Sequence, residues 1–183
     1  MKRSWKKWCT KSYTTATALH QFWDVDDEWK LICTRDYYNA IKDCGNPNPS
    51  GYISEQAYLN KVNGRATCDD HCYSPQFIGR MIHDNWDRYK DDYPEYERVF
   101  YYSCKTIVVT KKENDALSEF TKNDDEGFRI LVPTNLKYHE LGINLYKRYG
   151  GVRHWKDASP TYEDTFYVPE ELLEYEKSFL VCT

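Results

Sequence analysis

Residues 65–72 have the sequence RATCDDHC, in which Asp70 and His71 place a carboxylate directly beside an imidazole. A carboxylate is a ligand for a divalent cation, and a neutral imidazole is a base that can accept a proton from water. Together, the two groups are what a one-metal phosphodiester hydrolase requires. The alternative interpretation is structural: the acid lies in a solvated loop, and the backbone satisfies the histidine.

A second candidate ligand follows in residues 105–117, KTIVVTKKENDAL. The β-branched run from Thr106 to Val109 predicts a strand. Thr110 and Glu113 have the spacing of a capping box, which predicts a helix immediately after that strand. Asn114 therefore lies in the first helical turn, where a fixed backbone would direct its amide oxygen as a metal ligand requires. The alternative is a polar residue on an exposed helix face.

The composition indicates a globular protein. The chain has 183 residues, of which 40% are hydrophobic and 30% charged, unlike disordered or membrane chains. No apolar run approaches the ~20 residues of a membrane span, and the basic N-terminus is not followed by the apolar segment of a signal peptide. We therefore expect no membrane contact and a cytoplasmic location, which is the host cytoplasm if the chain is viral.

Seven cysteines without a signal peptide favour reduced thiols or a metal site over disulfides. Cys33, Cys44, Cys68 and Cys72 have the four thiolates of a structural zinc site. Neither pair has the tight C-x-x-C spacing, so scattered buried thiols are the favoured interpretation and structural zinc is the alternative.

Basic residues gather in two islands, residues 1–11 and 137–156, although the formal net charge is −4. Two such islands suit contacts with backbone phosphates at two places, and ordinary solvated surface is the alternative. Trp5 and Trp8, interleaved with lysines, resemble a nucleic-acid-binding arm. The residues that we assign to nucleic-acid binding are Lys6, Lys7, Arg65, Arg80, Lys147, Arg148, Arg153 and Lys156.

Most of the remaining chain predicts helices, with start and stop signals from capping residues, proline and glycine. Between the helices we expect a loop over residues 44–51, an extended segment over 65–68 and a strand over 128–132. A segment over 28–34 is either a strand or part of a helix. The expected helices cover residues 14–23, 35–42, 54–63, about four turns from Pro75, a segment from Pro94, residues 136–149 and a segment from Pro169.

Two stretches, RATCDDHCYSPQFIGRMIHDN and FYYSCKTIVVTKKENDAL, resemble the HNH, or ββα-metal, endonucleases, in particular the free-standing and homing enzymes of bacteriophages. The resemblance covers roughly residues 64–118, about a third of the chain. It implies that Asp70 is the metal-binding acid, His71 the general base, Asn114 the ligand on the closing helix and Asn85 the middle, positioning asparagine. The separation between His71 and Asn114 is longer than is usual in this family.

The resemblance implies an α+β fold, a mainly helical domain built around a small ββα-metal-like core. Residues 1–63 would form a basic arm and helical region, residues 64–121 the nuclease core, and residues 122–183 a strand-helix extension packed into the same unit. The implied activity is hydrolysis of duplex DNA with one Mg²⁺ or Mn²⁺ held by Asp70 and Asn114. Two-fold symmetric cutting would favour a homodimer.

A different class of function also suits this composition. A non-catalytic viral protein that binds a host protein or nucleic acid would use the acidic surface and the abundant tyrosines.

Overall fold

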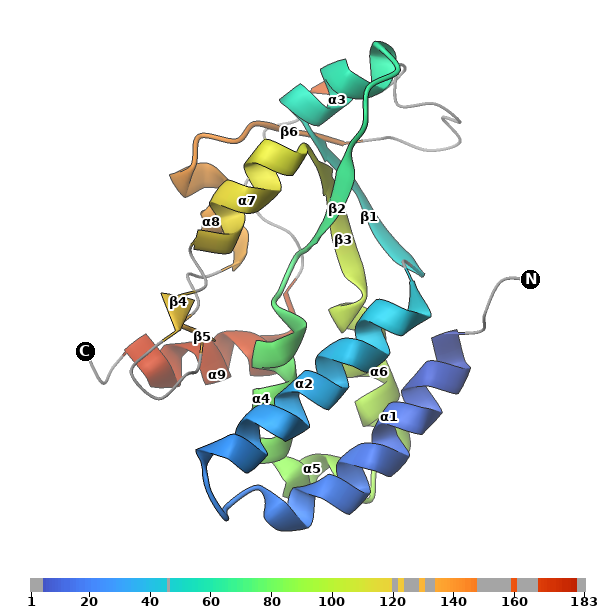
Figure 1. The fold of residues 1–183 in the computed structure, drawn as a ribbon, viewed down its shortest axis with the longest axis vertical. Coiled ribbons are helices and arrows are strands. Elements are labelled where there is room, and N and C mark those ends of the chain that lie inside the picture. Colours follow the sequence, from blue (N-terminus) through green and yellow to red (C-terminus); the bar gives the residue numbers. More distant parts are fainter. Residues whose placement is uncertain are drawn as a thin grey trace.

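The computed structural model describes residues 5–45, 47–119, 122–123, 129–130, 134–147, 159–160 and 168–180. Within these residues, helices and a mixed sheet make up one α+β structure, which confirms the fold class expected from the sequence (Figure 1). Residues 128 and 131–132 of the expected strand lie outside the described residues, and β5 covers the two residues between them.

The described helical segments are α1 (Trp5–Leu19), the 3-10 turn η1 (His20–Phe22), α2 (Asp27–Cys44), α3 (Glu55–Val62), α4 (Pro75–Asp84), α5 (Trp86–Tyr89), α6 (Tyr93–Ser103), α7 (Lys111–Glu119), α8 (Thr134–Glu140) and α9 (Glu170–Leu180). The described strands are β1 (Asn48–Ser54), β2 (Cys68–His71), β3 (Lys105–Val109), β4 (Lys122–Asn123), β5 (Arg129–Ile130), β6 (Leu145–Lys147) and β7 (Ser159–Pro160).

One sheet contains strands from all three of the segments that we expected from the sequence. Its strand order is β2-β3-β1-β6-β7, with β4 and β5 forming a separate ribbon. Strand β3 pairs parallel with β1 and antiparallel with β2, whereas β6 pairs antiparallel with β1. The central strands therefore come from the first 63 residues, the expected core and the C-terminal region.

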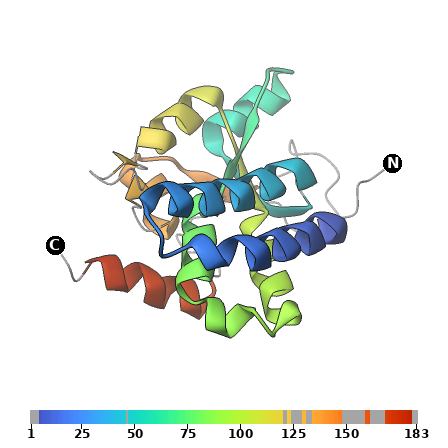
Figure 2. The same cartoon turned by 60° about the horizontal axis from the view of Figure 1, so that its bottom comes forward.

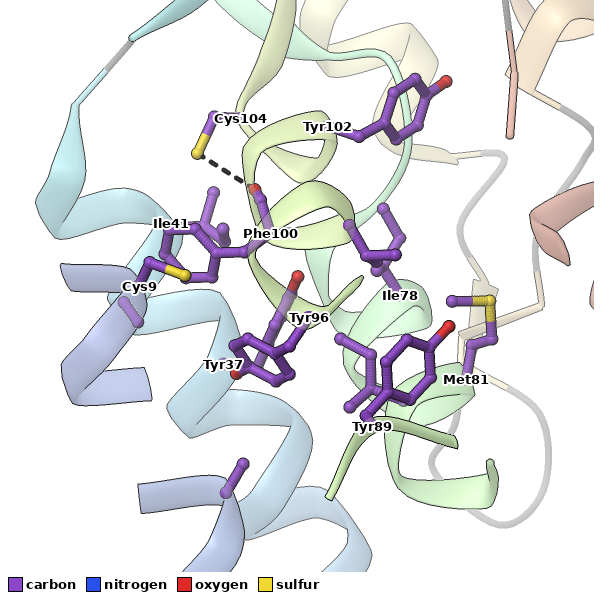
Figure 3. Close-up of a cluster of buried hydrophobic side chains, with 14 of the residues drawn as sticks. Cys9, Tyr37, Ile41, Ile78, Met81, Tyr89, Tyr96, Phe100, Tyr102 and Cys104 are labelled. Atoms are coloured by element: carbon purple, nitrogen blue, oxygen red, sulfur yellow. Dashed lines mark hydrogen bonds between the residues drawn. The ribbon is translucent and has the colours of Figure 1, made fainter. Parts of the chain in front are cut away.

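Helices α1, α2, α4 and α6 pack together below the sheet in the view of Figure 1, and α1 and α2 run side by side (Figure 2). Their buried faces meet in a core rich in aromatic rings, part of which is shown in Figure 3. Tyr37 and Tyr96 are almost fully buried there, and each phenol has a hydroxyl partner at 2.7 Å, Ser103 and Ser12 respectively. These bonds satisfy polar groups whose burial would otherwise cost stability.

A smaller core lies between the sheet and helices α7 and α8. It contains Ile107 and Val109 of β3, Leu117 of α7 and Tyr138 of α8. These helices therefore cover the face of the sheet on which the side chain of Asp70 lies, as described below.

The start of the chain differs from the expected basic arm. Helix α1 begins at Trp5, and Cys9, Ser12 and Ala16 are buried in the helical core. Of the helix expected over residues 14–23, the part up to Leu19 is the end of α1, and the next three residues form η1. Helix α2 is continuous from Asp27 to Cys44, so the strand considered over residues 28–34 is wrong. The Asp26 carboxylate caps this helix by accepting a hydrogen bond from the Trp29 N–H at 2.9 Å.

The loop expected over residues 44–51 is partly strand β1. Proline is tolerated in a strand where no second neighbour needs its missing N–H. Among the described residues, β3 alone pairs with β1 at Pro49, because the described pairs of β6 with β1 run from Tyr52 to Ser54. Gly51 has a φ of 83°, which suits the irregular register between Pro49 and Ile53.

The helix expected over residues 136–149 ends early. Gly142, at φ 63°, follows α8, and its N–H donates to the His139 carbonyl while the Ile143 N–H donates to the Tyr138 carbonyl, both at 2.8 Å. These bonds form a Schellman motif, which terminates a helix. The chain then enters β6, and the segment beyond Lys147 lies outside the described residues.

The start signals that the sequence predicts for three other helices are confirmed. Ser54 caps α3, Pro75 opens α4, and Pro94 lies in the first turn of α6. Helix α4 is shorter than four turns, since it ends at Asp84 and a separate short helix follows. Its buried residues include Phe77, Ile78, Met81 and Ile82.

Candidate active site

Asp70 and His71 end strand β2, which pairs antiparallel with β3. The register places Asp70 opposite Ile107 and His71 opposite Thr106. Because successive residues of a strand point to opposite faces of a sheet, the two side chains leave the strand on opposite sides. The carboxylate lies on the face covered by α7 and α8, and the imidazole lies on the other face.

Helix α7 completes a strand-strand-helix unit, since it begins after a single residue, Thr110, that follows β3. The expected capping box is present: the Thr110 N–H donates to Glu113 Oε2 at 2.7 Å, and the Glu113 N–H donates to Thr110 Oγ1 at 3.2 Å. Ser54 Oγ donates to the same Glu113 oxygen at 2.7 Å, which ties α7 to the β1–α3 junction. The helix that presents Asn114 is therefore fixed at its start and packs against β2.

The backbone carbonyl of Ser103 fixes the tautomer of His71. His71 Nδ1 lies 3.1 Å from that oxygen. A carbonyl oxygen only accepts, so Nδ1 carries the proton and Nε2 keeps an unprotonated lone pair. Ser103 is the last residue of α6, where helix carbonyls lack intrahelical partners. The half-buried imidazole thus caps one helix while leaving a basic nitrogen.

The surroundings of His71 favour its neutral form. Burial lowers its pKa, and the positive charge of Lys137 acts in the same direction. The carboxylate of Asp70 and the bond to Ser103 oppose this shift. The imidazole is therefore uncharged at neutral pH, which a general base requires.

The carboxylate of Asp70 has two donors on one oxygen. Lys137 Nζ lies 2.6 Å from Asp70 Oδ2, and the Tyr138 hydroxyl also donates to this atom. Burial raises the pKa of Tyr138 well above its usual value, and the charge of Asp70 adds to the effect, so the phenol stays protonated. Among the described residues, none donates to the other oxygen, Oδ1.

A divalent cation suits this carboxylate in charge and ligand type. Lys137 is the counter-ion of Asp70 in this structure, with its Nζ 2.6 Å from Oδ2, so a cation at this carboxyl group would lie beside an ammonium group. Mg²⁺ commonly uses only one or two carboxylates and keeps several water ligands. Across the described ranges, no three His, Cys, Asp or Glu side chains could hold one metal ion together, so any such cation would rely on Asp70, amide oxygen and water.

The two asparagines differ in their placement. Asn114 is half-buried on α7, the helix packed against β2, and in the part of the chain described here no hydrogen bond joins it to Asp70 or His71. Asn85 follows the C-terminus of α4, and its Nδ2 donates to the Met81 carbonyl at 2.9 Å. This ten-residue helix spans about 15 Å, so the structure does not bring Asn85 to the end of β2.

The basic residues expected to bind nucleic acid are dispersed. Lys6 and Lys7 are exposed on α1, where Lys6 Nζ lies 3.5 Å from Glu97 Oε1. Arg65 is exposed between α3 and β2. Arg80 lies on α4, with its Nε 3.7 Å from Asp84 Oδ2. The first island is therefore part of the helical layer rather than a free arm.

The second island is described only in part. Lys147 lies on β6, three strands away from β2 in the sheet, with its Nζ 5.4 Å from the centre of the Tyr52 ring. Its other assigned members, Arg148, Arg153 and Lys156, lie outside the described residues.

The four cysteines considered for zinc do not form a cluster among the described residues. Cys33 donates to the Leu19 carbonyl at 3.7 Å, and the Sγ of Cys44 lies 3.3 Å from the Sγ of Cys104. Cys68 and Cys72 belong to the core beneath α7 and α8. Burial raises the pKa of the Cys72 thiol to about 12, which keeps it protonated.

Three groups at this site were not expected from the sequence: Ser103, Lys137 and Tyr138. Ser103 acts through its backbone carbonyl, for which a sequence has no signal. Lys137 belongs to the second basic island but was not assigned a role. The Schellman glycine at 142, five residues later, was the available signal that a short helix presents Lys137 and Tyr138 here.

The chain matches no known family, no curated protein and no solved structure. Within the described ranges, no helix is both long and apolar enough to span a bilayer.

Proposed function

We propose that this protein hydrolyses phosphodiester bonds of duplex DNA, with His71 as the general base. The observation that carries the proposal is the bond from His71 Nδ1–H to the Ser103 carbonyl, which leaves Nε2 unprotonated at the end of β2. Further support comes from the order of β2, β3 and α7, which matches the strand-strand-helix unit expected from the resemblance.

His71 Nε2 accepts a proton from water as the water oxygen attacks phosphorus. The bond from phosphorus to the 3′-oxygen breaks on the opposite side, and solvent protonates the leaving oxygen. The negative charge of Asp70 favours the imidazolium that forms, because it raises the pKa of His71. Asp70 and Asn114 would hold Mg²⁺ or Mn²⁺, which when bound neutralises charge on the phosphate and the leaving oxygen.

The test uses a substrate without sequence preference, the p-nitrophenyl ester of thymidine 5′-monophosphate, with Mg²⁺, Mn²⁺ or EDTA. We expect metal-dependent release of p-nitrophenol by the intact chain. His71→Ala should lower the rate by about 10²–10⁴-fold, the usual contribution of a general base. The matched control is His139→Ala, which removes an exposed histidine of α8 and should leave the rate unchanged.

Equal rates for the intact chain and His71→Ala would refute the role of His71. A folded chain without phosphodiesterase activity would leave the other interpretation, a protein that binds a host protein or nucleic acid without catalysis. That interpretation stays a prediction, as does the homodimer.

A further inference from the structure

The turn between α1 and α2 carries apolar side chains that face solvent. Val25 is 60% exposed, and Ile32, on the face of α2 turned away from the helical core, is 40% exposed. The half-buried rings of Phe22 and Trp29 stack with their centroids 4.3 Å apart, and neither ring belongs to the two cores of the described residues. We call this surface the α1–α2 tip; it consists of Phe22, Val25, Trp29 and Ile32.

The local backbone structure holds these four side chains together. The Val25 N–H donates to the Phe22 carbonyl at 3.1 Å, which closes the turn. Trp29 and Ile32 are three residues apart in α2, so they lie at neighbouring positions of the helix surface. Single exposed apolar side chains are common on proteins, whereas apolar side chains that are gathered within a polar rim are typical of interaction sites.

Acidic side chains surround the α1–α2 tip. Residues 22–32 contain four acids and one lysine, and the Nζ of that lysine, Lys30, lies 3.5 Å from Asp27 Oδ1. Asp27 and Glu28 also suit the positive end of the α2 dipole, but the dipole accounts neither for the exposed Asp24 nor for the exposed apolar side chains. Phosphate groups of nucleic acids and anionic lipids would be repelled here, whereas lysine and arginine side chains would be attracted.

We propose that the α1–α2 tip binds a basic polypeptide segment that carries apolar side chains. The apolar residues of this segment pack on Val25, Ile32 and the stacked rings, and its lysines or arginines lie beside Asp24 and Glu28. The tip is at the lower end of the helical layer in Figure 1, whereas strand β2 of the candidate active site lies above that layer. The proposal therefore does not depend on the proposed hydrolysis.

The test measures the fluorescence anisotropy of a fluorescein-labelled peptide, KKLLKKLLKK, titrated with the full chain at low ionic strength. Two control peptides change one property each: EELLEELLEE reverses the charge, and KKSSKKSSKK removes the apolar side chains. We expect saturable binding of KKLLKKLLKK and at least about tenfold weaker binding of both control peptides.

Substitutions in the chain locate the bound peptide. Val25→Ser combined with Ile32→Ser should weaken binding at least about tenfold, because both apolar contacts are lost. Asp24→Asn combined with Glu28→Gln should weaken binding about threefold at low salt and less at high salt, because exposed charge pairs are weak and screened. All four side chains are exposed, and circular dichroism with urea unfolding shows which variants are folded.

Val62→Ser and Asp91→Asn are the matched controls. Val62 is a comparably exposed valine at the end of α3, at 52%, and Asp91 is an exposed acid before α6. Both variants should bind KKLLKKLLKK within about twofold of the unchanged protein.

No binding of KKLLKKLLKK to the intact chain would overturn the proposal, and so would unchanged affinity in the folded variant with Val25→Ser and Ile32→Ser. Equal affinity for EELLEELLEE would show that the acidic rim does not select a basic partner, which also overturns it. A second copy of this chain is the other occupant. A dimer seen by sedimentation that is lost with Val25→Ser and Ile32→Ser, without peptide binding, would assign the α1–α2 tip to self-association instead.

Discussion

The buried histidine of α4 makes the stability of this protein depend on pH. His83 is 3% exposed, and its ring stacks between those of Trp23 and Trp86 at centroid distances of 4.8 and 5.9 Å. Its Nδ1 lies 3.3 Å from the Nδ1 of His20, so one nitrogen donates and the other accepts. Burial lowers the pKa of His83 to about 3, and the neighbouring His20 adds to this shift.

The direction of the pH dependence follows from the pKa of His83 in the folded and in the unfolded protein. The pKa of His83 in the folded protein lies below its ordinary value of 6.5, so the unfolded chain binds the proton more readily. The contribution of neutral His83 to the free energy of unfolding is complete above pH 6.5 and is lost as the pH falls toward 3. Between pH 7.5 and 5.0 the unfolded state gains almost one proton at this position and the folded state almost none, which costs about 2 kcal/mol.

The assay is urea unfolding at pH 7.5 and at pH 5.0, for the unchanged protein and for His83→Phe. Phenylalanine keeps an aromatic ring between the two tryptophans but cannot be protonated. We expect the free energy of unfolding to fall by about 2 kcal/mol more in the unchanged protein than in the variant. Titrating groups away from His83, including His71 and Glu95, are present in both proteins and contribute equally, and adding His20→Gln to both proteins removes the one titrating partner of His83 from the comparison. The same pH dependence in both proteins would refute the burial argument.

Two further predictions concern single contacts. Diamide, a thiol oxidant, should form a disulfide between Cys44 and Cys104, whose Sγ atoms lie 3.3 Å apart, and it takes up the hydrogen that each thiol loses. The new bond closes a loop between residues 60 positions apart, which should raise the free energy of unfolding by about 4 kcal/mol. Peptide mapping detects the link, and its persistence in Cys44→Ser would show that other thiols react. Ser54→Ala should cost about 1–2 kcal/mol of stability, because Ser54 Oγ accepts from the Ala57 N–H at 3.0 Å as the cap of α3; urea unfolding measures this loss, and an unchanged midpoint would contradict the role of the cap.

The elements that the sequence predicts correctly are those whose signals are local. The N-cap of α3 at Ser54 and the capping box of Thr110 and Glu113 need only residues within one turn. Strand β1 was missed because its pairing with β3 depends on residues more than 50 positions away. Proline and glycine in β1 then predict a loop, although the irregular register accommodates both.

The residues of the candidate site differ in the same way, because some have local sequence signals and others have only long-range contacts. Adjacent Asp70 and His71 are visible in the sequence, and so is the helix that holds Asn114. Their partners are not, because Lys137 meets Asp70 from 67 positions away, and His71 meets a backbone atom from 32 positions away. Asn85 was included through the resemblance, and the length of α4 removes it from the end of β2.

The proposed chemistry depends on a neutral His71 ring with an unprotonated Nε2, and the protonation of this ring can be measured directly. Long-range ¹H–¹⁵N correlation spectra of the ¹⁵N-histidine-labelled protein at pH 7, with His71→Gln identifying the resonances, report the state of both ring nitrogens. We expect a protonated Nδ1 and an unprotonated Nε2. An imidazolium, or a neutral ring with its proton on Nε2, would contradict the proposed role of His71.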